Sequence, residues 1–263
     1  MKTIGLQIRS FIFLSLLIPV IYVNAQTVDD YIKEGDKYYN EYNNEKALDT
    51  FLKGEKAFPN NWELLWRISR SYVDIGEHMP SSTSEQEDAQ FKVYQKSLDY
   101  AERAVKQAPD KSVTYLRRAV SNGRIALFKG IFSVAGIVNA VRADCEKAIK
   151  LGNGGDEIQA ISHYVLARTN AEVSKKWKPA RSVLGLGWAD IDTAFVEYQK
   201  AISLRSNFVM FYVDYAEALV REDKYKLAKE MLGKALLSPK IDEDDDMRKE
   251  EAKKLLDEIK DED

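Results

Sequence analysis

Small and apolar residues recur along the chain at helical spacing, in paired segments that predict helical hairpins. The first pair has this pattern in the order Gly35, Tyr38, Ala47, Phe51 and Pro59. Small residues let two helices approach closely, aromatic residues fill the space between them, and a proline ends a helix. The pattern therefore predicts two packed helices that end near Pro59.

The small residue of the second helix recurs in later units. It stands at Gly54, Ala104, Ala148, Ala201 and Ala235. This recurrence resembles the tetratricopeptide repeat, a helix-turn-helix unit of about 34 residues that stacks into a solenoid. We therefore expect an all-α, right-handed tetratricopeptide-repeat solenoid of five helical hairpins.

The middle three units carry inserts between their paired helices, and only the interval from Ala201 to Ala235 has the plain length of 34 residues. The first insert, residues 77–89, is rich in Ser and Glu and predicts a solvated loop. The second, residues 129–141, is apolar and predicts longer helices, whereas the third, residues 175–188, is a basic and aromatic loop with glycines. Because the three inserts share one edge of the solenoid, we expect them to contribute to a binding face.

The C-terminal residues predict a capping helix. Residues 242–246 are acidic, as is favourable at a helix N-terminus, and Ala252, Leu255, Leu256 and Ile259 follow at helical spacing. A solenoid needs such a polar-backed cap. We therefore divide the chain into a signal segment of residues 1–25, a repeat solenoid of residues 26–240, and an acidic capping helix and tail of residues 241–263.

The N-terminal residues have the order of a secretory signal. Lys2 and Arg9 precede an apolar run over residues 11–23, which ends in the small-residue pattern Val23-Asn24-Ala25. We expect cleavage after Ala25 and export, with an uncleaved N-terminal anchor as the alternative. The single cysteine excludes an intrachain disulfide, which suits the periplasm of a Gram-negative bacterium. We expect no transmembrane span in the mature chain.

Charge and motif content exclude several classes of function. Loss of Lys2 and Arg9 changes the formal net charge from −3 to −5, and an acidic chain does not suit nucleic-acid binding. His78 and His163 are the only histidines, and neither stands at metal-ligand spacing. The chain has no candidate catalytic triad and no phosphate-binding glycine motif. We expect no enzymatic activity, no cofactor and no metal.

With the inserts placed, the chain resembles the regulator of microtubule dynamics family from about Tyr31 to Ile259. The likeness is carried by residues 34–39, by the loop of residues 177–188 before a helix that ends at residues 198–201, and by Ser238-Pro239. The resemblance implies the tetratricopeptide fold. Family members in animal cells are linked to microtubules, to mitochondrial contact sites and, for one, to phospholipid binding. An exported bacterial relative has no microtubules to meet, so the resemblance implies fold more than function.

The first helix of each unit presents one face to the concave groove of such a solenoid. Counting from the packing residues places there Tyr39, Asn40, Trp66, Arg70, Leu116, Arg124, Tyr164, Arg168, Val213 and Arg221. Arginine binds carboxylate or phosphate through a planar fork, and aromatic rings supply apolar contact area. We therefore expect the groove to capture an extended or anionic partner segment. In the alternative interpretation, Trp66 and Tyr164 belong to the core and each arginine pairs with Glu63, Asp74, Glu172 or Glu217.

A second candidate surface is the basic loop formed by Lys175, Lys176, Trp177, Lys178 and Arg181. Such a loop suits anionic lipid or a protein partner, although a merely solvated loop has the same composition. Taken together, the sequence predicts a non-enzymatic protein-protein interaction or scaffold module. The alternative is a lipid-binding or lipid-shuttling protein, in which the long middle units enclose an apolar pocket with arginines at its mouth.

Overall fold

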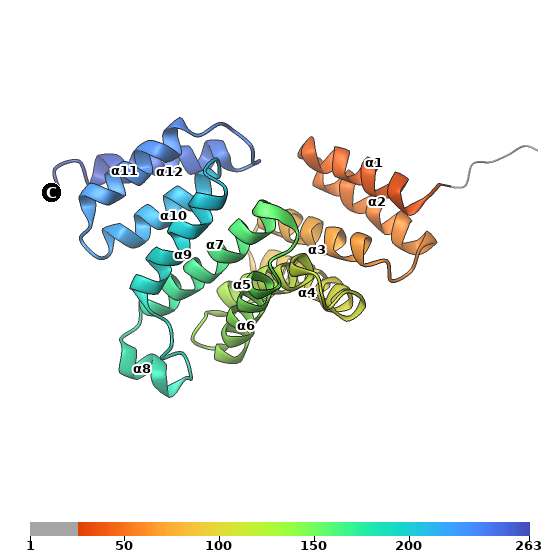
Figure 1. The fold of residues 1–263 in the computed structure, drawn as a ribbon, viewed down its shortest axis with the longest axis horizontal. Coiled ribbons are helices and arrows are strands. Elements are labelled where there is room, and N and C mark those ends of the chain that lie inside the picture. Colours follow the sequence, from red (N-terminus) through yellow and green to blue (C-terminus); the bar gives the residue numbers. More distant parts are fainter. Residues whose placement is uncertain (1–25) are drawn as a thin grey trace, which may run out of the picture.

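The computed structural model describes residues 26–263, which form twelve helices and no strand (Figure 1). The helices are α1 Val28–Asn40, α2 Asn44–Ala57, α3 Trp62–Glu77, α4 Ser84–Gln107, α5 Ser112–Lys129, α6 Ala135–Leu151, α7 Gly155–Ser174, α8 Lys178–Val183, α9 Ile191–Leu204, α10 Val209–Val220, α11 Tyr225–Leu237 and α12 Asp245–Glu258. The predicted all-α solenoid is confirmed. The predicted signal segment lies outside the described residues.

The helices pack as five successive hairpins. The pairs are α1 with α2, α3 with α4, α5 with α6, α7 with α9, and α10 with α11, and α12 packs on the last pair. Each first helix also contacts the first helix of a neighbouring unit, as in α3 with α5 and α5 with α7. The first helices therefore form one continuous side of the solenoid, which positions the candidate site.

The small residues of the repeat pattern lie where paired helices touch. Gly54, Ala104, Ala148, Ala201 and Ala235 are all buried. A Cβ atom at Gly35 would lie 2.2 Å from Cε1 of the buried Phe51 ring, so only glycine fits at this crossing. Tyr38 is only half-buried, so the predicted filling role belongs to Phe51 more than to Tyr38.

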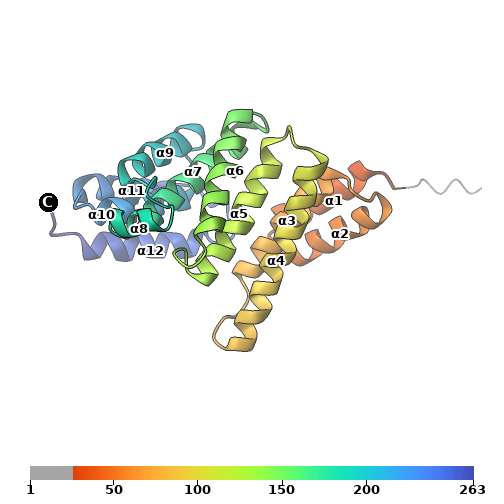
Figure 2. The same ribbon diagram turned by 90° about the horizontal axis from the view of Figure 1, so that it is seen from below.

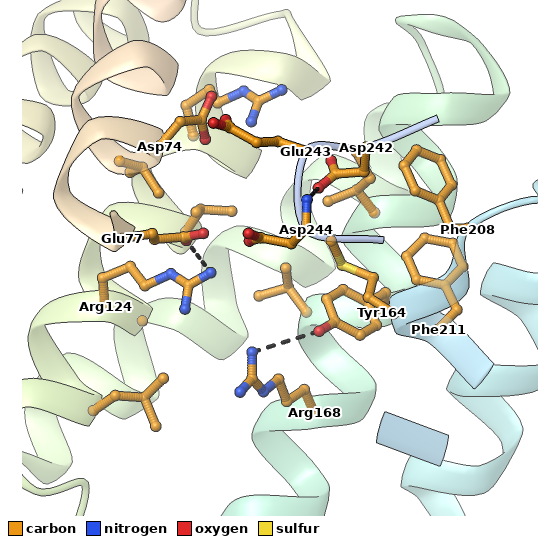
Figure 3. A pocket seen from close by; sticks show the side chains of 18 of the residues that line it. Asp74, Glu77, Arg124, Tyr164, Arg168, Phe208, Phe211, Asp242, Glu243 and Asp244 are labelled. Carbon is orange, nitrogen blue, oxygen red and sulfur yellow. Dashed lines mark hydrogen bonds and ion pairs between the residues drawn. The ribbon is translucent and has the colours of Figure 1, made fainter. Parts of the chain in front are cut away.

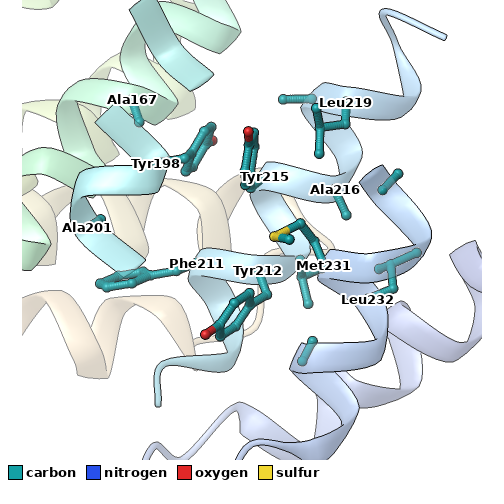
Figure 4. Close-up of a cluster of buried hydrophobic side chains, with 14 of the residues drawn as sticks. Ala167, Tyr198, Ala201, Phe211, Tyr212, Tyr215, Ala216, Leu219, Met231 and Leu232 are labelled. Carbon is teal, nitrogen blue, oxygen red and sulfur yellow. The ribbon is translucent and has the colours of Figure 1, made fainter. Parts of the chain in front are cut away.

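The largest buried cluster lies in the C-terminal hairpins (Figure 4). The rings of Tyr198 on α9 and Tyr215 on α10 stack with centroids 5.2 Å apart, and Leu219 and Leu232 continue the cluster towards α11. Stacked aromatic rings contribute beyond their buried area. This core fixes α7 and α10 relative to one another, and both helices contribute to the site.

The first two inserts mainly lengthen helices. The predicted solvated loop of residues 77–89 is wrong after Thr83, because α4 begins at Ser84. The Thr83 side chain accepts from the backbone N–H of Gln86 in a capping box, which starts the helix there. Figure 2 shows the N-terminal half of α4 projecting beyond the neighbouring hairpins. In the second insert, α5 extends to Lys129 and α6 begins at Ala135, which confirms the predicted lengthening.

The capping helix begins later than its acidic run. The Asp245 carboxylate accepts from the backbone N–H groups of Ile241 and Asp242 at 2.8 Å each, and α12 starts at Asp245. Ala252 and Ile259 are buried against the last hairpin, as the helical spacing predicts. Residues 241–244 are left as a non-helical stretch that passes beside the groove.

Candidate functional site: a cavity in the groove

A cavity of about 300 Å³ lies on the side formed by the first helices (Figure 3). Its wall comes from α1, α2, α3, α5, α6, α7, α10 and α12, and from residues 241–245, which we call the closing segment. The apolar part of the wall consists of side chains such as Val120, Ile161, Val165, Phe208 and Phe211. A concave apolar surface with a few polar groups is the usual form of a binding site.

The closing segment joins the last unit to the first ones. Glu243 accepts a hydrogen bond from the Asn44 side chain at 2.9 Å, and Asp244 accepts one from Nε2 of His78 at 3.0 Å. The other ring nitrogen of His78 donates to the carbonyl oxygen of Asp74 at 2.8 Å. Both contacts with the closing segment cross the groove. They join residues that are far apart in sequence: Asn44 and Glu243 are separated by 199 positions, and His78 and Asp244 by 166.

His78 faces acceptors with both ring nitrogens, so its ring carries two protons. Burial disfavours the charged form, but the hydrogen bonds to Asp244 and to the Asp74 carbonyl outweigh burial and raise the pKa of His78 to about 9. The ring is therefore a cation at neutral pH. It holds the acidic closing segment by charge-assisted hydrogen bonds.

Only part of the predicted groove set lines this cavity. Tyr39, Asn40, Arg124, Tyr164 and Arg168 are on the wall. Leu116 and Val213 are fully buried, because their faces point into the helix contacts rather than the groove. The aromatic residue Tyr164 is also buried, and its hydroxyl donates to Asp214 at 2.6 Å.

The four arginines that the sequence placed together in the groove, Arg70, Arg124, Arg168 and Arg221, have different neighbours in the structure. The prediction that they share one concave surface is therefore wrong. Arg124 pairs with Glu77, and Arg168 lies 3.3 Å from Asp214. Arg70 bonds Asp36 at 3.1 Å and is absent from the wall, because the contact draws it towards α1. Arg221 lies beyond the cavity and donates to the Ala171 carbonyl at 3.2 Å. Three of the four therefore have acidic partners, although not the ones predicted.

Trp66 has a structural position beside Arg70. Its Nε1 donates to Glu63 at 3.0 Å, and the Arg67 guanidinium lies 4.1 Å from its ring centroid. Arg70 itself lies 3.4 Å from the centroid of Tyr39. This network ties α1 to α3 and contributes to the wall only through Tyr39.

Sequence reasoning missed Arg117, the residue after Leu116. Arg117 lines the cavity and is 9% exposed, and its guanidinium forms no hydrogen bond or ion pair with any residue in the range 26–263. Arg117 stands seven positions before Arg124, which is two helical turns, so the two share a face of α5. This seven-residue spacing is the feature of the sequence from which Arg117 could have been predicted as a groove residue.

Carboxylates outnumber arginines on the wall. Asp74, Glu77, Glu157, Glu172, Asp242, Glu243, Asp244 and Asp245 line the cavity, with Arg117, Arg124, Arg168 and Arg248. Asp74 and Glu77 face the acidic closing segment (Figure 3). Burial, with the nearby Glu77 carboxylate, raises the pKa of Asp74 to about 7, and burial also raises the pKa values of Glu77 and Asp242. The wall is thus unsuited to a polyanion.

The side chains of the basic loop differ in their exposure to solvent. Lys175, Lys176, Trp177 and Lys178 are exposed, whereas Arg181 is buried and donates to the Ala189 carbonyl at 2.9 Å. Arg181 therefore belongs to the fold of the insert and not to its surface. None of these five residues is on the cavity wall, although Lys175 pairs with the wall residue Glu172.

Two further features of the described chain bear on its chemistry. Residues 26–263 hold no group of His, Cys, Asp and Glu side chains suited to a metal ion. Within that range, no helix has the length and apolar content that crossing a bilayer requires.

Comparison with known proteins decides the family. The family model described as Regulator of microtubule dynamics protein 1-3 matches residues 31–260. The chain belongs to the regulator of microtubule dynamics family. The resemblance inferred from the repeat residues and the third insert is thereby confirmed.

Relatives within the regulator of microtubule dynamics family are distant in sequence. Regulator of microtubule dynamics protein 2 of Mus musculus is 25% identical over 227 residues, which are 84% of this chain and 53% of the relative. Regulator of microtubule dynamics protein 1 of the same species is 28% identical over 132 residues, 50% of this chain and 41% of the relative. The chain spans about half the length, or less, of the curated relatives that it matches.

A solved structure supports the fold of this family member. A thermophilic TPR protein of Thermus thermophilus aligns with a TM-score of 0.61 at 16% identity, over 86% of this chain and 98% of that one. At this identity the likeness shows the tetratricopeptide fold. A protein-interaction module is the general function that fold and family together support.

Proposed function

We propose that this protein is a non-enzymatic interaction module that captures an extended partner segment in the groove cavity, with one carboxylate of that segment bound to Arg117. The observation that carries the proposal is the buried guanidinium of Arg117, which forms no hydrogen bond or ion pair within residues 26–263. Its nearest compensation is the Trp66 ring, 5.6 Å from the guanidinium carbon, and the longer-range attraction of Asp74 and Glu157. A buried charge without a partner is costly, and a bound carboxylate supplies the missing charge and acceptors. The ligand thus completes a site that the chain leaves incomplete.

The composition of the wall restricts the partner further. The eight carboxyl groups on the wall outnumber its four arginines and His78, which disfavours a run of acidic residues in the partner. Apolar side chains such as Ile161, Val165 and Phe211 favour apolar partner residues. The expected partner segment is therefore largely apolar and carries a single carboxylate near its centre or at its C-terminus. The sequence analysis expected an extended or anionic partner segment, and the proposal restricts that partner to an apolar segment with a single carboxylate.

An extended segment suits the shape of the site. The closing segment is itself non-helical up to Asp245 and lies along the same cavity, held by Asn44 and His78. We propose that capture takes place outside the cytoplasm, because the chain begins with the order of residues typical of a secretory signal.

The proposal is tested with two matched peptide libraries, one ending in a free carboxylate and one ending in an amide. Peptides selected on the full chain should be apolar with one carboxylate. Charge-assisted hydrogen bonds contribute about 1.5–3 kcal/mol, so Arg117→Gln should weaken the selected peptides roughly 10- to 100-fold in calorimetric titration. Lys226→Gln is the matched control, because Lys226 is an exposed cation on α11 that lies away from the cavity wall.

Two results would contradict the proposal. One is equal peptide affinity of the parent and Arg117→Gln while circular dichroism shows unchanged helicity. The other is the selection of no peptide from either library, together with a copurified phospholipid in native mass spectrometry, which would favour the lipid-shuttling alternative. Urea denaturation of Arg117→Gln separates misfolding from loss of binding, because the substitution removes a buried charge and also the attraction that Asp74 and Glu157 exert on it.

A further inference from the structure

Large exposed apolar side chains gather on the third insert. Trp177, Val183 and Leu184 are 75%, 86% and 38% exposed, and they are three of the eight large hydrophobic residues exposed within residues 26–263. The other five are spread over the rest of the solenoid, from the α1–α2 turn to α12. Scattered apolar residues are normal on a protein surface, but a local group marks an interaction site.

The insert presents these side chains from a fixed framework. Leu186 is fully buried, the Arg181 guanidinium donates to the Ala189 carbonyl at 2.9 Å, and Trp188 Nε1 donates to Asn139 of α6 at 2.7 Å. The inward residues thus anchor the turn to the solenoid, while Trp177 and Val183 remain exposed. Figure 1 shows α8 projecting at the lower edge of the molecule, beyond α7 and α9.

The sequence that contains α8 is basic, and its flanking acidic residues are Glu172 and Asp190. Residues 173–189 contain four Lys and Arg and no Asp or Glu, although the chain has a formal net charge of −3. Residues 125–143, at the α5–α6 turn, also contain two basic residues and no acidic one. The two stretches meet where the Lys176 ammonium lies 4.7 Å from the ring centroid of Phe132. Both stretches therefore contribute positive charge to one edge of the solenoid.

We infer that this edge of the molecule docks on an anionic membrane surface. The docking surface, which we call the α8 patch, consists of Lys175, Lys176, Trp177, Lys178, Val183 and Leu184. Tryptophan favours the interface between headgroups and acyl chains, and a short apolar stretch flanked by lysines inserts there at shallow depth. The lysines attract anionic headgroups.

The shape and chemistry of the α8 patch favour a membrane over an acidic protein. The helix α8 projects beyond α7 and α9 (Figure 1), so a broad lipid surface can meet it without a matching pocket. Its cations are lysines, whose long stems reach headgroups while the apolar side chains insert. The ion pair of Lys175 with Glu172, at 2.6 Å, is exposed and contributes little that would compete.

Membrane docking is tested by co-sedimentation of the full chain with vesicles. Vesicles of equal parts phosphatidylglycerol and phosphatidylcholine should bind the chain, and vesicles of phosphatidylcholine alone should bind it far less. Replacing Lys175, Lys176 and Lys178 together with Gln should weaken binding to the anionic vesicles by about 100-fold. Val183→Ser should also weaken binding, whereas Leu237→Ser, at a similarly exposed residue on α11, should not.

A residue-specific readout separates the α8 patch from any other membrane-binding segment. Brominated phospholipids in the anionic vesicles should quench tryptophan fluorescence, and Trp177→Phe should abolish most of that quenching, since the other three tryptophans are half-buried. Quenching that persists in Trp177→Phe would overturn the inference, as would unchanged binding of the triple lysine variant. If the triple lysine variant still bound vesicles but no longer bound an acidic protein partner, the inference would be overturned in favour of a protein interface. Arg117→Gln should bind vesicles like the parent, which keeps this test independent of the cavity.

Discussion

The contact between Gly35 and Phe51 provides a test of the packing on which the solenoid rests. A Cβ atom at Gly35 would lie 2.2 Å from Cε1 and 2.6 Å from Cδ1 and Cζ of Phe51. Forcing a methyl group into a packed core costs about 1–3 kcal/mol, and the fully buried ring places this site at the upper end. Alanine gains about 1 kcal/mol in helix propensity over glycine. Gly35→Ala should therefore lower the free energy of unfolding by about 2 kcal/mol.

The matched control is the same substitution where space is open. A Cβ atom at Gly233 of α11 would have no neighbour within 4 Å, so Gly233→Ala should raise the free energy of unfolding by about 1 kcal/mol. Urea denaturation followed by circular dichroism measures both variants.

A double-mutant cycle isolates the contact. Phe51→Val removes all three ring atoms that the new methyl group would meet, so in that background Gly35→Ala should cost nothing or stabilise. The reasoning is refuted if Gly35→Ala stabilises the parent as Gly233→Ala does, or if its cost is the same with and without the Phe51 ring.

Three further predictions concern charge and processing. Because burial raises the pKa of Asp74 from 3.8 to about 7, its stabilising contribution is complete below pH 3.8 and is lost as the pH rises to about 7. Asp74→Asn should therefore be more stable than the parent at pH 8, by up to about 4 kcal/mol, and equally stable near pH 4; a less stable variant at pH 8 would contradict this. The charge-assisted His78 contacts are complete below pH 6.5 and weaken through about pH 9. The protection factors of amides 242–244, which are the exchange rates corrected for the intrinsic effect of pH, should therefore fall over that range; constant protection factors would contradict this. Protein from the native host should begin at Gln26, and N-terminal sequencing that starts at Met1 would exclude cleavage.

The repeat architecture was predictable because its determinants are local. Gly35, Ala148 and Ala201 are small where helices cross, and this requirement recurs at a spacing that the sequence displays. The start of α4 was missed although its signal was present, since Thr83 and Gln86 form a capping box. A serine- and glutamate-rich stretch suits both a loop and an exposed helix, and the cap decides between them.

The candidate site was less predictable because it depends on helix rotation and on distant contacts. Choosing Leu116 instead of Arg117 rotates the groove face of α5 by about 100°, enough to exchange a core residue for a cavity residue. Periodicity does not determine which acidic side chain reaches Arg70 or Arg168, since Asp36 and Asp214 come from other helices. The closing segment meets His78 only after five units have stacked, so no local pattern indicates the contact.

Site-specific photo-crosslinking in the native host tests the central claim, capture of a partner segment in the cavity, most directly. Gly123 lies on the cavity wall with open space around its Cα, and Gly233 has equal space on α11 away from the wall. A diazirine-bearing residue at position 123 should give a protein adduct that position 233 does not. Mass spectrometry should map the adduct to an apolar segment with one carboxylate, and Arg117→Gln should abolish it. Identical adducts from both positions, or an adduct at position 123 that survives Arg117→Gln, would contradict the account.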